Sequence, residues 1–233
     1  MNKQNQLQRV KVGEYRFYEK IATKERFISV TSCLSILPKP GIILWAVMQT
    51  VKYIKQKQSI SDKILGEAFH FHKDLLVLLA NEGTEDHNII EHYLLTGEIR
   101  DPKDPSIIRF KKWEEESGFK IEHTELMLSN DRLKSAGTAD LIGKCSSVGM
   151  VVDLKTSKAI RLSHKIQAAV YKYMYGEHDR RAAILLIPRD MKRKYEFYIL
   201  TREEEQLYLK IYYLLSQLFY LLWDLGEIDP NKK

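Results

Sequence analysis

The sequence predicts a mixed α/β or α+β fold in which helices flank a central mixed β-sheet. Short apolar runs bounded by turn residues are typical of strands, and apolar residues three or four apart are typical of helices. After two N-terminal strands, these patterns give helices, three strands, a helix, two strands and a final helix. This order favours helices layered on one sheet. The expected strands lie at residues 15–18, 26–30, 119–128, 137–143, 151–157, 182–187 and 194–200.

The first long helix is expected between Ile42 and Gln56, because Pro40–Gly41 punctuates the chain just before it. Ahead of this helix, Thr31–Ser32 is expected to cap a short helical turn that ends before Pro38. Apolar side chains at helical spacing predict a stripe facing the core. That stripe consists of Trp45, Met48, Val51 and Ile54.

A second helical stretch opens at Ser61–Asp62 and is expected to break near Gly83. We expect a new helix from Thr84 to Leu95, closed by Gly97, because glycine commonly ends helices. The apolar positions before the break again predict core packing. They are Leu65, Phe69, Leu76 and Leu79.

Three further helices are expected along the remainder of the chain. Residues 107–116 form a charged helix, and residues 163–175 form an amphipathic one. Thr201 is expected to cap the last helix, with acidic residues at its positive end, and this helix runs to about Leu225. The inward side chains of the amphipathic helix are Ile166, Ala169, Val170 and Tyr173.

The two central strands form the most informative part of the sequence. Serine and glycine between them suit a hairpin turn, and a fold between Ser146 and Ser147 would set Asp140 opposite Asp153. Directly opposed residues point to the same face, with Cβ atoms about 4.5–5.5 Å apart. Lys155 shares that face, because side chains alternate along a strand. Two carboxylates this close repel each other unless a cation lies between them.

A plainer interpretation treats these charges as solvated ion pairs on an exposed sheet face, which are common. The flanking residues favour the functional interpretation, because both acids are embedded in apolar strands where an unpartnered carboxylate would be costly. These apolar neighbours are Leu141, Ile142, Val151 and Val152.

Charge is unevenly distributed along the 233 residues, whose net charge is +6. Residues 1–60 hold eleven Lys or Arg against three Glu, a net +8, whereas the remainder is slightly acidic. A basic surface suits a polyanionic substrate, although many soluble proteins are simply basic. We expect one domain spanning residues 1–233, in which residues 1–60 are a basic extension packed on the core.

The composition excludes several classes of protein. No apolar run reaches the roughly 18 residues of a membrane span, and the N-terminus lacks the apolar segment of a secretion signal. Cys33 and Cys145 are too few for a four-thiolate zinc site or iron–sulfur cluster, so we expect free thiols. We therefore expect a cytoplasmic protein.

Four short blocks resemble, in order, the motifs of the PD-(D/E)XK nuclease superfamily in its RecB-like branch. Residues 15–175 carry the likeness, and the lead-in at residues 29–31 and 40–45 is similar to that of phage exonucleases and the mitochondrial genome maintenance exonuclease. Each block alone is weak, whereas four at fitting spacing are fairly specific. They are Gly83–Thr84 with His87 and Glu91, then Gly137–Asp140, then Asp153–Thr156, then Gln167 with Tyr171.

The resemblance implies a restriction-endonuclease-like core and a metal-dependent deoxyribonuclease, an exonuclease that acts on DNA ends or single strands in repair, recombination or replication. It implies one or two Mg²⁺ or Mn²⁺ ions bound by Asp140, Asp153, His87 and the backbone carbonyl of Leu154, with Lys155 at the water or phosphate. It assigns supporting roles to Glu125, Gln167 and Tyr171, and DNA contacts to Thr156, Ser157 and Lys158.

Two departures from the superfamily pattern are present. Ala139 stands where the superfamily name expects proline, and the cysteine quartet that binds an iron–sulfur cluster in some relatives is absent, which implies the cluster-free subgroup. The resemblance also implies DNA as partner, alongside a helicase or recombination protein, and no membrane, in the cytoplasm of a bacterium or a phage-infected cell. Two alternatives stay open: a non-catalytic DNA-binding module on the same fold, and a nuclease directed at RNA. Without the resemblance, His87 is a structural helical histidine.

Overall fold

The computed structural model describes residues 6–57, 59–188, 190 and 192–228. The chain divides into two compact units, one formed by residues 1–36 and 89–233 and the other by residues 37–88. The predicted mixed α/β class is confirmed, since the first unit is built on an eight-stranded mixed sheet. The expectation of one domain with residues 1–60 as an extension stays a prediction.

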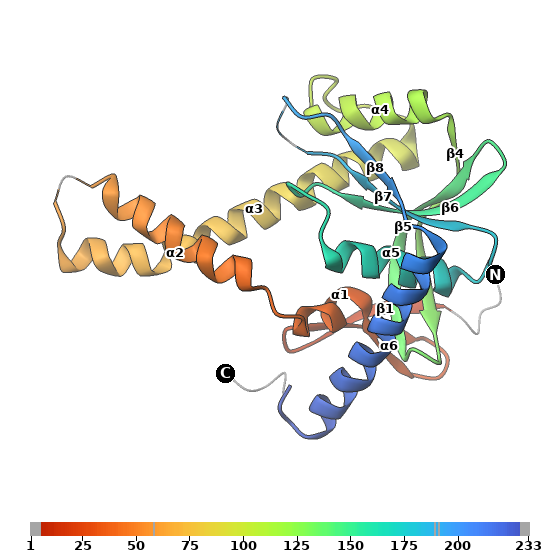
Figure 1. The fold of residues 1–233 in the computed structure, drawn as a ribbon, viewed down its shortest axis with the longest axis horizontal. Helices are drawn as coiled ribbons and strands as arrows, with labels where there is room; N and C mark the ends of the chain where they lie inside the picture. The colour runs from red at the N-terminus through yellow and green to blue at the C-terminus, as the bar shows by residue number, and fades with distance from the viewer. Residues whose placement is uncertain (1–5, 58, 189, 191, 229–233) are drawn as a thin grey trace. The chain divides into compact units, whose positions relative to one another are not determined.

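The sheet has the order β1-β2-β3-β5-β6-β7-β8, with β4 paired to β5 beside this path (Figure 1). The β3–β5 and β6–β7 pairs are parallel and the other pairs are antiparallel. The strands are β1 (Leu7–Val12), β2 (Tyr15–Lys20), β3 (Arg26–Ser29), β4 (Phe119–Asn130), β5 (Ser135–Cys145), β6 (Val148–Lys155), β7 (Arg181–Leu186) and β8 (Glu196–Ile199).

Helices cover both faces of the central strands. Each of the other described α-helices lies wholly within one unit or the other, whereas α3 contains residues of both units. The helices are α1 (Val30–Cys33), followed by the short 3-10 turn η2 (Leu34–Ile36), α2 (Pro40–Lys55), α3 (Asp62–Thr96), α4 (Pro105–Ser117), α5 (Leu162–Tyr175) and α6 (Arg202–Asp224).

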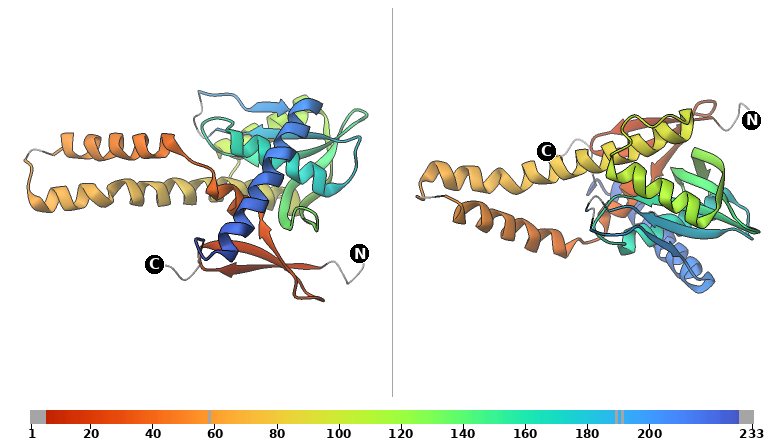
Figure 2. Two further views of the ribbon diagram at one scale, coloured as in Figure 1. Left: turned by 60° about the horizontal axis from the view of Figure 1, so that its bottom comes forward. Right: turned by 90° about the horizontal axis from the view of Figure 1, so that it is seen from above.

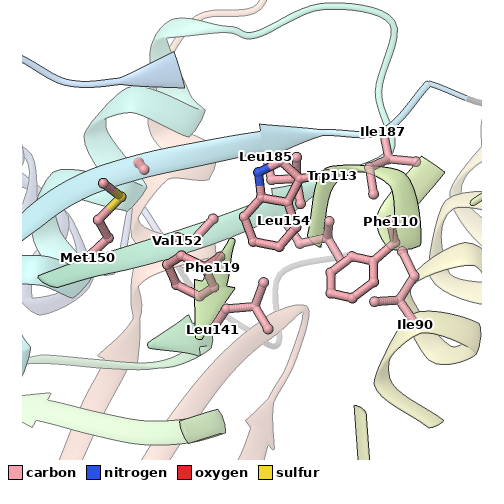
Figure 3. Close-up of a cluster of buried hydrophobic side chains, with 11 residues drawn as sticks. Ile90, Phe110, Trp113, Phe119, Leu141, Met150, Val152, Leu154, Leu185 and Ile187 are labelled. Carbon is pink, nitrogen blue, oxygen red and sulfur yellow. The ribbon is translucent and has the colours of Figure 1, made fainter. Parts of the chain in front are cut away.

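One face of the sheet is sealed by aromatic side chains of α4. Trp113 and Phe110 are fully buried and contact each other, and Trp113 also contacts Phe119 at the start of β4 (Figure 3). Burial of this much aromatic surface is the main contribution that fixes α4 on the sheet. The strand residues of this cluster are Leu141, Met150, Val152, Leu154, Ala183 and Leu185.

The opposite face of the same strands is covered by α5. Ala168 and Ala169 pack there against Ala182 and Ile184, which alternate along β7 with the residues of the first cluster. Strands buried on both faces read as continuous apolar runs. A polar residue between Val152 and Leu154 must therefore face the α5 side.

The last helix, α6, packs against the first strands. Aromatic rings of Tyr15 and Phe17 contact Phe219 and Trp223 of α6 edge to face, with centroids 5.3–6.1 Å apart. The Tyr220 hydroxyl accepts a hydrogen bond from Ile28 N and donates one to the carbonyl of Lys134. Helix α6 thus fixes the N-terminal strands to the sheet.

The second unit is a helical hairpin. Figure 2 shows α2 and the first part of α3 side by side. The Tyr53 ring lies 4.6 Å from Phe71 between centroids, and its hydroxyl donates to Glu67 over 2.7 Å. Lys57 lies 4.3 Å above the Tyr53 ring. One tyrosine therefore organises the contact between these two helices.

Most predicted elements are confirmed, and the differences have local causes. The short α1 is capped by Ser29 rather than by Thr31–Ser32, because the Ser29 side chain accepts from Ser32 N. The strand β1 was not expected, although Val10 and Val12 alternate with polar residues. Gly97 closes α3 as predicted, in a left-handed conformation with φ +74°.

The predicted break near Gly83 is wrong, because α3 continues without interruption from Asp62 to Thr96. A glycine inside a helix costs only about 1 kcal/mol relative to alanine, and neighbouring turns offset that cost cooperatively. The expected core stripes are also wrong in part. Met48, Val51, Leu65, Phe69 and Leu76 are exposed, and the side chain of Leu79 lies outside the described residues.

Across the described ranges, no single helix is both long and apolar enough to cross a membrane. One bent pair, residues 30–36 with 41–55, meets the length and composition criterion only when both pieces are taken together.

Candidate metal centre on the β5–β6 hairpin

The register of the β5–β6 hairpin agrees with the one predicted from the sequence. Leu141 pairs with Val152 and Cys145 with Val148, so the chain turns at Ser146–Ser147. Ser146 adopts a left-handed conformation with φ +53°, as tight hairpin turns require. One position beyond the Leu141–Val152 pair, this register brings Asp140 opposite Asp153.

Both carboxylates lie on the α5 side of the sheet. Asp153 is only 1% exposed, between two residues of the opposite apolar cluster. The Asp140 carboxylate reaches across the hairpin and accepts a hydrogen bond of 2.7 Å from Leu154 N. The Asp140 side chain is therefore held against the backbone between Asp153 and Lys155.

Lys155 places a cation beside this pair. Its Nζ lies 2.7 Å from an Asp153 carboxylate oxygen, and its side chain is 19% exposed. Burial disfavours the ammonium form, but the charges of Asp153 and Asp140 outweigh burial and raise the pKa of Lys155 above its ordinary value. Lys155 is thus a cation at neutral pH.

Helix α5 contributes two polar side chains to the same face. Gln167 donates a hydrogen bond of 3.0 Å to the Tyr171 hydroxyl, and both side chains are buried. Burial, with the nearby Asp153 and Asp140 charges, raises the pKa of Tyr171 well above its ordinary value. Tyr171 packs directly on Gly137, where an added Cβ would come within 2.4 Å of the ring. Only glycine allows that contact.

Glu125 on β4 lies beside Asp140 in the β4–β5 register, between the Thr124–Leu141 and Leu126–Ala139 pairs. Its φ of +49° is a left-handed conformation that costs energy in any residue with a Cβ. Such strained residues cluster at functional sites. The β4 backbone therefore departs from regular strand geometry at the residue that lies beside Asp140.

Helix α3 is unbroken, so His87 and Glu91 lie one turn apart along it. One carboxylate oxygen of Glu91 and one of Glu125 lie within 4.8 Å of each other. Both side chains are half-buried. Two carboxylates in this geometry suit a divalent cation.

The donors around the hairpin also fit the implied Mg²⁺ or Mn²⁺. Both ions are hard cations that favour carboxylate oxygen, and Mn²⁺ also accepts imidazole. Asp140 and Asp153 supply carboxylates on one face, and a buried carboxylate such as Asp153 is stable only with compensating positive charge. The described residues thus contain two sets of suitable donors.

The strand before Asp140 is tied to the N-terminal strands. The hydroxyl of Thr138, two residues before Asp140 on β5, accepts a 3.0 Å hydrogen bond from Arg9 Nη2 on β1. It lies equally close to the Tyr18 hydroxyl on β2. Arg9 also lies 3.8 Å from Glu125. These contacts brace the acidic face from the β1–β2 side.

The loop after β6 carries the residues predicted to touch DNA. Thr156 and Ser157 are half-buried and Lys158 is exposed. The Ser157 hydroxyl donates to the carbonyl of Ala159, which fixes the bend. These residues follow Lys155 directly, and their role in binding DNA stays a prediction.

Sequence reasoning missed several residues of this region. Glu91 was placed in the helical motif with His87 but was not assigned as a metal ligand. Arg9 and Tyr18 come from strands more than one hundred residues away in sequence, which no local pattern reports. His164 at the start of α5 was also missed; burial, Lys155 and Arg161 lower its pKa to about 3.

No protein-family model matches the chain, and no curated protein matches it. One solved structure, titled "Crystal structure of SSO0001", is 12% identical and covers 78% of this chain and 86% of its own, with a TM-score of 0.35. A likeness this weak carries no argument about fold or function.

Proposed function

We propose that this protein is a metal-dependent nuclease that cuts phosphodiester bonds in DNA, on a restriction-endonuclease-like core. The observation that carries the proposal is the register of the β5–β6 hairpin. It sets Asp140 opposite Asp153, with Lys155 bonded to Asp153 at the end of the strand. The basic N-terminal segment supports a polyanionic substrate.

Each side chain of the site has a definite task in this proposal. Asp140 and Asp153 hold the cation, while Leu154 N keeps the Asp140 carboxylate oriented. Glu91 and Glu125 offer further donors, and His87 stays the imidazole ligand that the resemblance implies. A divalent cation, when bound, lowers the pKa of a bound water and offsets charge on phosphate.

Lys155 is positively charged and partly accessible, so it can orient the attacking water or contact the phosphate. Tyr171 retains its proton, because its pKa is raised, and can therefore donate a hydrogen bond. Gln167 fixes the Tyr171 hydroxyl in place. These two residues therefore position the lysine or the DNA strand and transfer no proton in the reaction.

The first prediction tests this proposal with matched charge-neutral variants. End-labelled single- and double-stranded DNA is incubated with the protein and Mg²⁺ or Mn²⁺, with EDTA as the metal-free control. Asp153→Asn and Lys155→Ala should lower the cleavage rate by at least about a hundredfold, as expected for loss of a group that stabilises the transition state. DNA affinity should persist, or tighten in Asp153→Asn, because a negative charge near phosphate is lost.

Asp131→Asn and Lys112→Ala are the controls, because each removes one like charge from an exposed side chain that lies outside the β5–β6 hairpin. Both controls should cleave at the wild-type rate. Metal-independent DNA binding without turnover in the wild type would instead favour the non-catalytic module. Preferential cleavage of RNA in a competition assay would reassign the substrate while keeping the site.

A further inference from the structure

A hollow of about 440 Å³ opens on the β1–β2 face, beside the strands that brace the acidic hairpin. Its charged lining is mainly basic, with Glu14 as the one acidic side chain among the lining residues that the structure describes. The lining residues are Arg9, Val10, Lys11, Glu14, Arg16 and Ser32.

The cations in this hollow are aligned by the strand register. Lys11 lies opposite Arg16 on the paired strands, so both side chains point to the same face. Arg9 is two residues before Lys11 on β1 and shares that face, about 6.6 Å along the strand. Lys11 and Arg16 are exposed, and no carboxylate of the described residues lies within ion-pair distance of either.

The same face leads directly to the candidate metal centre. Arg9 donates to Thr138, two residues before Asp140, and lies 3.8 Å from Glu125. Arg9 is therefore the link between the hollow and the acidic hairpin. A chain of negative groups that reached the hairpin and extended past Arg9 would meet Lys11 and Arg16 next.

We propose that the hollow binds a phosphodiester group of the DNA strand that is cut at the hairpin, with Lys11 and Arg16 as its ligands. This inference rests on the proposed nuclease function. Guanidinium and ammonium groups on a rigid strand pair are well suited to phosphate. Continuity with the hairpin favours a nucleic-acid strand over an acidic peptide, since only a substrate strand must span both places.

The experiment compares Lys11→Gln/Arg16→Gln with a matched double variant, Lys112→Gln/Lys210→Gln, which removes two exposed lysines from α4 and α6. Binding of labelled single-stranded DNA is measured in EDTA at several salt concentrations. Each phosphate contact contributes about 0.7 to the slope of log affinity against log salt for single strands. The first variant should therefore lose about 1.4 from that slope, whereas the second should keep the wild-type slope.

Cleavage kinetics give an independent readout. Lys11→Gln/Arg16→Gln should raise KM about tenfold or more and leave kcat within about twofold, because the site binds strand without touching the reacting bond. Arg16→Lys should recover part of the affinity, and the unfolding midpoints of all variants should match wild type.

An unchanged slope and KM in Lys11→Gln/Arg16→Gln would overturn the proposal, as would equal losses in both double variants. Binding of an acidic peptide that is lost in Lys11→Gln/Arg16→Gln, while DNA binding by that variant is unaffected, would also overturn it. If wild type cleaves DNA but Lys11→Gln/Arg16→Gln keeps the wild-type salt slope, only this inference fails. If wild type neither binds nor cleaves DNA, the proposed function itself fails.

Discussion

At the residue scale, the contact between Gly137 and Tyr171 joins the strand before Asp140 to helix α5. The Tyr171 ring occupies the space that a side chain at residue 137 would need. The ring in turn carries the hydroxyl that Gln167 fixes near the two carboxylates. The position of the Tyr171 ring beside the acidic face therefore depends on the absence of a side chain at Gly137.

The second prediction concerns this contact. Gly137→Ala should lower the free energy of unfolding by about 1–3 kcal/mol, because the new methyl group overpacks against the Tyr171 ring. Tyr171→Ala should also destabilise, by leaving a cavity. The double variant should be more stable than the sum of the two losses predicts, since the clash is removed. Urea unfolding of wild type, the two single variants and the double variant measures these free energies. Strictly additive losses would contradict the contact.

Local sequence patterns predicted Asp140, Asp153 and Lys155 on one face, because strand alternation and turn residues fix a hairpin register. The same patterns could not report Glu125's left-handed backbone or Arg9's bond to Thr138. The first is a strain imposed by packing, and the second joins residues 129 positions apart. Nonlocal contacts of this kind leave no periodic signal in a single sequence.

At the element scale, the β5–β6 hairpin depends on its turn. The third prediction is that Ser146→Gly raises the free energy of unfolding by roughly 0.5–1 kcal/mol, because glycine adopts a positive φ without the steric cost that serine meets. Ser147→Gly is the matched control and should be neutral or destabilising. Urea midpoints of the two variants provide the measurement. Equal effects would show that Ser146 is not strained in solution.

Helix α3 shows where sequence patterns misled us at this scale. Gly83 and the polar residues around it predicted a break, yet the helix is continuous across them. A break needs a strong stop such as proline, and the sequence between residues 81 and 84 has none. One consequence is that His87 and Glu91 belong to a single long helix. Their spacing is then fixed by helix geometry alone.

At the scale of the whole molecule, the order of elements along the chain predicted the mixed sheet and its flanking helices. Apolar runs in β6 and β7 predicted strands covered on both faces, and the two clusters on either side of them agree. The sequence did not predict the grouping of residues 37–88 as a separate unit. Helical apolar stripes look alike whether they face a core or stay exposed, as Met48 and Phe69 do.

The fourth prediction concerns the stability of the fold at acidic pH. His164 is half-buried at the start of α5, and its Nδ1 accepts a hydrogen bond from Arg161 N, which requires the unprotonated ring. Burial, followed by the charges of Lys155 and Arg161, lowers the pKa of His164 to about 3. The unfolded chain keeps an ordinary histidine pKa near 6.5.

Between these two pKa values the unfolded state binds the extra proton, so the free energy of unfolding must fall as pH decreases below about 6.5. The stability is fully present above that pH, and on the order of 2 kcal/mol should be lost by pH 5. His164→Gln cannot take up this proton, so its urea midpoint should decline less between pH 7 and 5. The exposed His178→Gln control should follow wild type. Parallel curves for wild type and His164→Gln would show that His164 titrates normally, and that the ring does not pack beside Lys155 as the fold requires.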